Sequence, residues 1–408
     1  MIGSTNIKHG GTKSIIIVSI VTGSTVAVYS NEECTIKIKD AIEKSSGKFW
    51  LTGLDNRAYY IKATLSGDEA ITSYTITEYG VYRINMAYRS IPEFTYSGTC
   101  EVVEDNDTII SDSDIANYTG NWKIRFLTSG TLSFSNLYGV DKIDVFLVGG
   151  GGGGAASGSV KGGAGGGYTT TSKGVAVSTG IDYEIGIGSG GARSTAGGAS
   201  TAFDLTANGG AAGTSANGGK GGSGGGSDYR GGGADGADGA HDSSSTGGTG
   251  QHTSTREFGG YENTVAESVS SSTTFVLGTT PTTVEQAFLV NGKYLTIGSD
   301  RSTTLGNNNV YPISTYDAST NTVTLSTTIT ATAGEVVMFG NLYSGGGAGG
   351  AGSIVQAGGY GGGGDGAAGS TAAKAGTAHT GGGGGGAAAS ANGGVGGSGI
   401  VIIRNIRS

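Results

Sequence analysis

Apolar and polar residues alternate in short stretches through the first part of the chain, which is typical of β-strands bounded by turns. Turn signals such as Thr22-Gly23 and Tyr79-Gly80 separate these stretches. Asp40–Lys44 is expected to form at most one helical turn. Residues 1–92 are therefore predicted to be a compact β-sandwich. Its expected strands are Ser14–Ile20, Thr25–Ser30, Thr35–Ile38, Ala58–Leu65, Ile71–Thr77 and Val81–Tyr88.

A second group of β-type segments lies much later, where threonine, valine and tyrosine are frequent. Asn291-Gly292 stands between two of these segments and is a strong signal for a tight hairpin. Residues 262–343 are therefore predicted to be a small, inserted all-β subdomain. Its expected strands are Thr273–Leu277, Gln286–Val290, Lys293–Ile297, Thr322–Ser326 and Glu335–Phe339.

Around this insert, glycine replaces the apolar pattern, and most of the 84 glycines lie between Gly149 and Gly399. Glycine costs about 1 kcal/mol relative to alanine inside a helix, so helices are excluded here. Two β-branched segments, Lys142–Val148 and Ile400–Arg404, bracket the glycine-rich part. We expect these two strands to pair and close one domain, formed by residues 121–261 and 344–408.

The glycine runs are either disordered or extended with backbone bonded to backbone. The bracketing strands and apolar segments such as Gly180–Gly188 favour the ordered alternative. The extended form would be a threefold helix like polyproline II, whose N–H and C=O groups bond to neighbouring helices. With only 3 prolines, the chain is not collagen. The expected scaffold glycines are Gly149, Gly150, Gly151, Gly152, Gly153, Gly154, Gly381, Gly382, Gly383, Gly384, Gly385 and Gly386.

Ordered runs of this kind would not tolerate a Cβ. Gly383→Val is therefore expected to be strongly destabilising, whereas Ala388→Val, in the turn Ala387–Asn392, is expected to be tolerated.

Charge and motifs exclude several function classes. The formal net charge of -8 argues against a surface for nucleic acid. Lys161 is followed by Gly162, so no phosphate-binding loop is present. Acidic residues in 93–120 indicate either a calcium site or a polar connector, and the missing central glycine favours the connector. No paired carboxylates stand out, and Asp235 and Asp238, which are three residues apart, are expected to be solvated. We therefore expect a non-enzymatic protein without metal or cofactor.

The turns between glycine runs carry the candidate binding residues. Ala155–Lys161, Thr214–Asn217 and Ala387–Asn392 are expected at the end away from Val148. The end at which Asp228–Arg230 and His241–Ser245 lie is left open. Exposed aromatic and arginine side chains are frequent binding anchors. The candidates are Ser157, Lys161, Thr214, Asn217, Tyr229, Arg230, Ser390 and Asn392.

Three segments resemble the glycine-rich domain of bacteriophage tail-fibre tip adhesins: Trp122–Phe134, Gly139–Val148 and Gly396–Arg404. The resemblance covers about residues 118–408 and is interrupted at about 262–343. It implies a stack of polyglycine II helices with binding loops at one end. Residues 1–92 look like the immunoglobulin- or transthyretin-like modules of phage tail proteins.

This resemblance implies a receptor-binding protein of the virion that contacts a bacterial surface receptor, either protein or glycan. The N-terminal domain would attach to other tail proteins, and the assembly would be a homotrimer or a monomer. The chain shows no signal-peptide pattern, and Ile15–Val21 is too short to span a membrane. Synthesis in the host cytoplasm is therefore expected. The alternative is a structural tail or surface protein whose glycine-rich domain mediates subunit packing.

Overall fold

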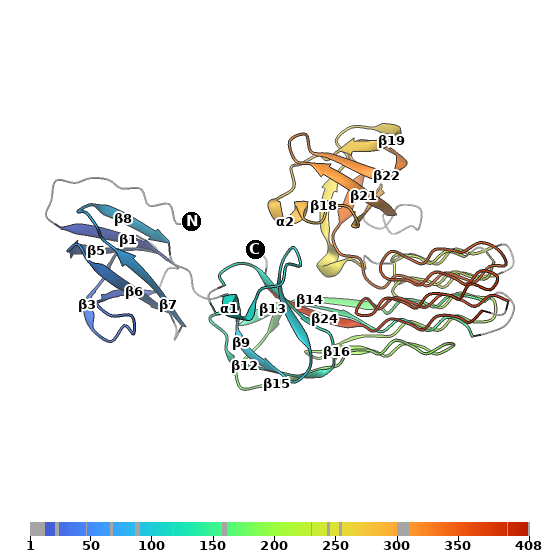
Figure 1. The fold of residues 1–408 in the computed structure, drawn as a ribbon, viewed down its shortest axis with the longest axis horizontal. Helices are drawn as coiled ribbons and strands as arrows, with labels where there is room; N and C mark the ends of the chain where they lie inside the picture. The colour runs from blue at the N-terminus through green and yellow to red at the C-terminus, as the bar shows by residue number, and fades with distance from the viewer. Residues whose placement is uncertain are drawn as a thin grey trace. The chain divides into compact units, whose positions relative to one another are not determined.

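The protein is described by a computed structural model, and its fold is mainly β (Figure 1). The chain divides into two compact units. The first contains residues 1–93, 111–121 and 135–141, and the second contains the remaining residues. The described residues are 13–20, 24–45, 47–65, 68–85, 90–116, 118–156, 161–229, 231–242, 245–252, 255–299, 310–389 and 391–406.

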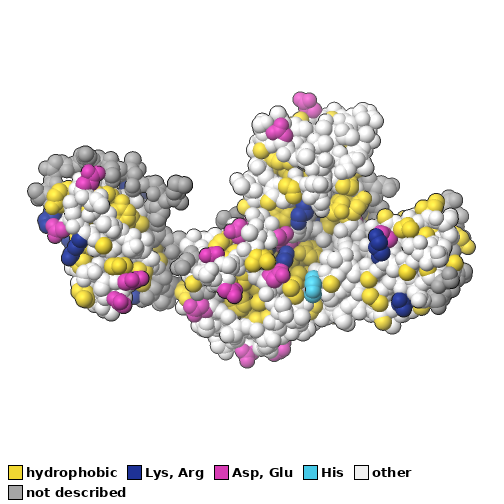
Figure 2. All heavy atoms as spheres, viewed as in Figure 1, with side chains coloured by type: hydrophobic (Ala, Val, Ile, Leu, Met, Phe, Trp, Pro, Cys, Tyr) yellow, Lys and Arg dark blue, Asp and Glu magenta, His cyan; other side chains and the backbone are white. Residues whose placement is uncertain are grey.

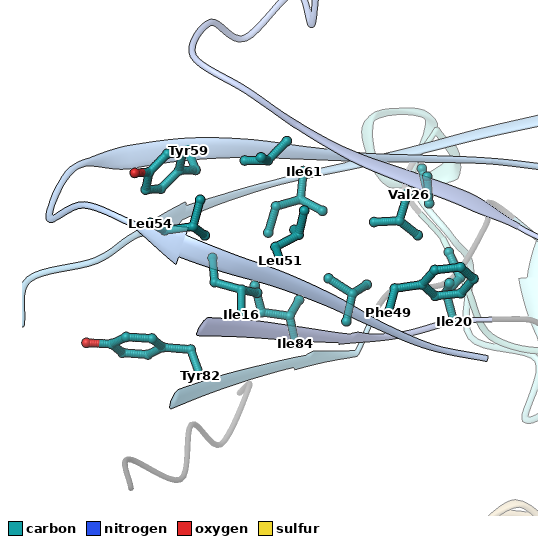
Figure 3. Close-up of a cluster of buried hydrophobic side chains, with 14 of the residues drawn as sticks. Ile16, Ile20, Val26, Phe49, Leu51, Leu54, Tyr59, Ile61, Tyr82 and Ile84 are labelled. Atoms are coloured by element: carbon teal, nitrogen blue, oxygen red, sulfur yellow. The ribbon is translucent and has the colours of Figure 1, made fainter. Parts of the chain in front are cut away.

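Two four-stranded sheets form the first unit, with strand orders β4-β5-β1-β8 and β3-β2-β6-β7. Side chains from both sheets, including Ile16, Leu51 and Ile61, are fully buried in one apolar core (Figure 3). This burial supplies the main stabilisation of the unit. The strands are β1 (Ser14–Ser19), β2 (Thr25–Tyr29), β3 (Lys37–Asp40), β4 (Ile42–Ser45), β5 (Lys48–Leu54), β6 (Ala58–Leu65), β7 (Asp68–Thr75) and β8 (Val81–Asn85).

The prediction of a helical turn at Asp40–Lys44 is wrong, because strand β4 begins at Ile42 and pairs with β5. Gly47 has a φ of 68°, which permits the tight turn between these two strands. The Glu43 carboxylate accepts the N–H of Gly47 at 2.9 Å and closes that turn.

Residues 93–120, expected to be a polar connector, contain two strands and a short helix. They are β9 (Glu93–Tyr96), β10 (Cys100–Glu104) and α1 (Asp112–Ile115). Val102 and Val103 of β10 are buried, and β10 pairs with β11 (Trp122–Phe126). The acidic residues here alternate with core residues, so composition alone concealed the strand.

A five-stranded sheet with order β10-β11-β24-β13-β14 begins the second unit. It adds β13 (Lys142–Val148), β14 (Thr169–Ala176) and the last strand, β24 (Ile400–Asn405). Strand β24 lies between β11 and β13, and Val148 is opposite Ile400. The predicted pairing of the two strands that bracket the glycine-rich part is thus confirmed.

Smaller sheets flank this one. A three-stranded sheet has the order β15-β12-β9, and a separate hairpin joins β16 to β17. These strands are β12 (Gly130–Asn136), β15 (Asp182–Ile185), β16 (Ser200–Ala202) and β17 (Leu205–Ala207).

Beyond Val148 the backbone is bonded to neighbouring segments in a threefold pattern. Along residues 149–155, the first, fourth and seventh N–H groups donate to residues 162–168. The second and fifth donate to 195–198, and the third and sixth donate to 394–397. In each partner segment the residue number of the acceptor falls as the residue number of the donor rises, so all three segments are antiparallel to the run. One neighbour is thus met on every third residue.

The carbonyl groups of the same run face three other segments, which are parallel to it. Gly191 and Ser194 donate to the carbonyls of Gly151 and Gly154. Gly210 and Gly213 donate to those of Gly150 and Gly153, and Gly384 donates to that of Gly152. Six segments therefore surround one run. A Cβ built on Gly151 would lie 2.0 Å from the carbonyl oxygen of Gly382, so this packing requires glycine.

The inserted part forms a six-stranded sheet with order β18-β23-β20-β21-β22-β19. Its core contains fully buried Leu289, Leu295, Ile313, Val323 and Phe339. The elements are the 3-10 helix η1 (Glu257–Gly259), β18 (Tyr261–Thr264), β19 (Val269–Val276), α2 (Thr283–Gln286), β20 (Tyr294–Gly298), β21 (Val310–Asp317), β22 (Thr322–Ala331) and β23 (Val336–Phe339).

Two predictions for the insert are wrong. Residues 286–290 form the end of α2 and the following turns rather than a strand, and Asn291-Gly292 leads into β20 without closing a hairpin. The reason is a capping box. The Thr282 hydroxyl accepts the N–H of Glu285 at 3.4 Å, and the Glu285 carboxylate accepts the N–H of Thr282 at 2.6 Å. This pair starts a helix where the apolar residues alone indicate a strand.

Candidate binding surface formed by turns between glycine runs

The glycine runs alternate in direction, so their turns gather at two ends. We call the end remote from β13 and β24 the turn face (Figure 1). Its described residues are 155–156, 161, 192–195, 214–217, 228–229, 241–242, 245–246, 350–357, 367–372, 387–389 and 391–392.

Neighbouring turns on this face are bonded to one another. The Asn217 side-chain oxygen accepts the N–H of Thr246 at 2.9 Å. The N–H of Asp228 donates to the carbonyl of Ala216 at 3.0 Å, and the N–H of Tyr229 donates to that of Gly350 at 2.9 Å. Four turns far apart in the sequence thus form one continuous surface.

Lys161 joins this group of turns to the turn at Ala387–Asn392. Its N–H donates to the carbonyl of Ala387 at 2.9 Å, and its carbonyl accepts the N–H of Gly350 at 2.7 Å. The Arg193 guanidinium donates to the carbonyl of Gly393 at 2.7 Å. Backbone bonds therefore fix the positions of the turns before any ligand is bound.

Five predicted binding residues lie on the turn face: Lys161, Thr214, Asn217, Tyr229 and Asn392. The Thr214 hydroxyl accepts the backbone N–H of Asn217 at 3.1 Å, so the Thr214 side chain holds its own turn. Tyr229 is 54% exposed and is the aromatic residue among the five. The other predicted residues, Ser157, Arg230 and Ser390, lie outside the described residues.

Two turns whose end of the domain the sequence could not assign, Asp228–Arg230 and His241–Ser245, have their described residues on the turn face as well. The hydroxyl of Ser245 donates to the Asp228 carboxylate, which ties the turn at 241–246 to the turn at 228–229. Both turns therefore belong to the surface that carries Tyr229.

A family comparison covers this whole arrangement. The family model described as a glycine-rich domain matches residues 127–405. The chain belongs to this glycine-rich domain family. The match runs from the end of β11 into β24, so it includes both bracketing strands and the insert. Among curated proteins, none matches the chain.

Within the glycine-rich domain, two exposed apolar residues of the turn face were missed. Ile354 and Val355 are 66% and 49% exposed, in the turn that follows Gly350. Adjacent exposed apolar side chains make these two residues candidates for a contact surface, because contiguous apolar patches mark such surfaces. The sequence Gly352-Ser353-Ile354-Val355 does contain a signal, because a β-branched pair stands among small residues. Counting glycine runs across the insert, however, could not show at which end of the domain this turn lies.

Two of the acidic residues considered for calcium, Glu101 and Asp107, are instead bonded to cations. Lys123, almost fully buried, lies 2.6 Å from Asp107 and 2.9 Å from Glu257. Burial would raise the pKa of Asp107, but the charge of Lys123 and hydrogen bonds from Lys123 and Asn341 outweigh it and hold that pKa below its usual 3.8. The cluster connects β11 with both ends of the insert and acts as a structural joint.

A second buried acidic residue lies at the end of the glycine runs opposite the turn face. Asp235 was expected to be solvated, but it is buried and accepts the N–H groups of Tyr360 and Gly361 at 2.8 and 2.7 Å. Burial raises its pKa above the usual value, and burial lowers the pKa of nearby Arg256 to about 10. The expectation of solvation is wrong because the partners lie more than a hundred residues away in the sequence.

Within the described part of the chain, no group of three or more His, Cys, Asp or Glu is placed to hold a metal ion. None of the helices described here is long and apolar enough to cross a membrane. Figure 2 shows few charged side chains on the visible face of the glycine runs.

Proposed function

We propose that this chain is a receptor-binding protein, or adhesin, at the tip or fibre of a bacteriophage tail. It recognises a receptor on the bacterial surface, either protein or glycan, through the turn face and the insert. The observation that carries the proposal is the gathering of turns with exposed Tyr229, Ile354 and Val355 at one end of a backbone-bonded scaffold. Loops held by a rigid scaffold are a common basis for recognition.

The scaffold is proposed to be a bundle of polyglycine II helices. Three features support this: the partner segment of each run repeats every three residues, six segments surround the central run, and a Cβ would clash there. A threefold extended helix has about 3 residues per turn and leaves its backbone groups for neighbours. Rigidity of this kind reduces the entropy lost when the turns bind.

The remaining parts of the chain have supporting roles in this proposal. The first unit, an immunoglobulin- or transthyretin-like sandwich, attaches the chain to other tail proteins in the virion. The protein is non-enzymatic and acts as a homotrimer or a monomer.

Adsorption of the purified, labelled full-length chain to a panel of bacterial strains tests this function. Tyr229→Ala and Ile354→Asp should each reduce saturable binding to a responsive strain, because each removes an exposed contact. Ile181→Asp is the matched control, since Ile181 is 48% exposed but lies next to β12, away from the turn face.

The outcomes separate the two functions. Reduced adsorption by the turn-face variants, with the control unchanged, supports the adhesin. If adsorption is unaffected and the same variants stop the chain from assembling into particles, the structural role in subunit packing replaces it.

A further inference from the structure

The insert contains an open hollow of about 410 Å³ that the turn face does not include. One wall is the turn after α2, where Leu289 is buried and Val290 and Asn291 are exposed. Gln286 stands beside them, and its side-chain N–H₂ group donates to the carbonyl of Pro281 at 2.9 Å. The volume is in the range of small-molecule sites, about 300–1,000 Å³.

The opposite wall is the end of β21, where three consecutive residues face one hollow. Ser314, Thr315 and Tyr316 all line it, although successive residues of a regular strand point to opposite faces. The cause is a bulge, since the pairing of β21 with β22 shifts between Ile313 and Thr315. Bulges commonly redirect side chains at functional sites. The local irregularity thus places Ser314, Thr315 and Tyr316 along the same hollow.

Tyr316 is a fixed wall rather than a mobile surface side chain. Its ring packs against the core of the insert, and its hydroxyl donates to the Asn321 side-chain oxygen at 3.1 Å. One part of the ring therefore faces the hollow in a defined orientation. An immobile apolar surface costs little conformational entropy when a ligand contacts it.

The lining has a distinctive chemistry. None of the described residues that line the hollow is charged; they offer two amides, two aliphatic hydroxyls, a tyrosine ring and aliphatic surface. Amides and hydroxyls both donate and accept hydrogen bonds, as the hydroxyl groups of a sugar do. Val290 and Ala318 provide exposed apolar surface of the kind that packs against the C–H face of a sugar ring.

We propose that this hollow binds one ring of a neutral saccharide. A phosphate or an acidic sugar would lack a cation among the lining residues, and burying an unpaired charge is costly. A purely apolar ligand would leave the Asn291 amide and the Ser314 and Thr315 hydroxyls without the water they contact in the free protein. A neutral polyol meets both requirements.

This inference deepens the proposed function, because it assigns a glycan ligand to the insert. It rests on that function only for the claim that the glycan belongs to a bacterial surface. Binding of a sugar to the purified chain is a separate observation from adsorption to cells. The two can therefore fail independently.

The test is a titration of the full-length protein, followed by saturation-transfer NMR and calorimetry. The probes are the methyl glycosides of glucose, galactose, mannose, rhamnose and N-acetylglucosamine, with methyl glucuronide as the acidic comparison. We expect saturable binding of at least one neutral glycoside and at least tenfold weaker binding of the glucuronide.

Variants locate the site. Ala318→Trp should abolish binding by filling the hollow, whereas Ala333→Trp, at another exposed position of the insert, should leave it unchanged. Asn291→Ala and Thr315→Ala each remove one hydrogen-bonding group and should weaken binding about threefold to tenfold. Unchanged thermal unfolding of each variant shows that the fold is retained.

Two results overturn the proposal: no saturable binding of any neutral glycoside, or binding that persists in a folded Ala318→Trp protein. If sugar binding is absent while adsorption to cells still depends on Tyr229 and Ile354, the hollow is not a site and the adhesin function stands. If sugar binding follows the variants while no strain is adsorbed, the site stands without the proposed function.

Discussion

Single residues in the glycine runs are constrained by backbone rather than by side chains. A Cβ on Gly383 would lie 2.3 Å from the carbonyl oxygen of Ala164, closer than non-bonded atoms approach. The tolerance expected for Ala388 is contradicted, because Ala388 is fully buried with Ala367 and Ala391 in a small alanine cluster. Even the turns contain tightly packed positions, so a valid comparison needs a position in open space.

Gly352 provides that comparison, since no atom lies within 4 Å of a Cβ placed there. We predict that Gly383→Ala lowers the free energy of unfolding of the second unit by about 1–3 kcal/mol through overpacking. Gly352→Ala should change it by less than about 0.5 kcal/mol. Chemical denaturation of both variants measures the difference, and equal small effects would argue against backbone packing at Gly383.

The buried ion cluster predicts a pH dependence. The folded pKa of Asp107 lies below its usual 3.8, so this carboxylate contributes stability that is complete above that value and is lost as the pH falls through the folded pKa. Asp107→Asn should therefore cost about 1–3 kcal/mol at pH 7 and progressively less below about pH 4.

Unfolding of parent and variant between pH 2.5 and 8 provides the measurement, with the range chosen to cover the usual carboxyl pKa of about 3.9. Asp204→Asn, at an exposed turn with a φ of 61° that asparagine adopts readily, is the control. Asp235 has a raised pKa and acts in the opposite sense, so only the difference between parent and variant isolates Asp107. A difference that does not change with pH would exclude this ion pair as its cause.

Among the elements, β24 connects the two ends of the second unit. Ile402 of this strand is fully buried and lies opposite Arg125 of β11 and Phe146 of β13. Ile402→Ala should destabilise the second unit by about 2–5 kcal/mol through the cavity that it leaves. Val395→Ala, at a 43% exposed position in the preceding run, should have a much smaller effect. Comparable losses in thermal unfolding would show that β24 is not central.

The elements also show what a sequence can and cannot specify. Lys142–Val148 and Ile400–Arg404 were recognisable as paired strands because β-branched residues are rare elsewhere in the glycine-rich part. Strand β10 and helix α2 were not recognised, because one mixes acids with valines and the other depends on a Thr282–Glu285 capping pair beside apolar residues.

The same limit applies to the turn face. Lys161 and Tyr229 were predicted because they stand out from glycine and alanine, and the structure places both on this face. Ile354 and Val355 were missed because the direction of a run depends on how many runs precede it, and the insert interrupts that count. Asp235 was misjudged because its partner Tyr360 is 125 residues away in the sequence.

For the whole molecule, the central claim is that glycine runs form a rigid, hydrogen-bonded scaffold that displays turns at one end. Every third N–H group of Gly149–Gly154 donates to the same neighbour, and the carbonyls of the run accept from three further segments, so opening one run requires breaking bonds to six others. Cooperative bonding of this kind slows local opening. The bonded N–H groups should therefore be protected from solvent although they carry no side chains.

Amide hydrogen exchange of the full-length protein, resolved to peptides by mass spectrometry, tests this claim most directly. We predict that Gly149–Gly154 and Gly381–Gly386 exchange as slowly as β13 and β24, whereas the turn at 352–356 exchanges rapidly. Exchange of both glycine runs as fast as that turn would contradict the scaffold, and with it the basis for displaying a binding surface.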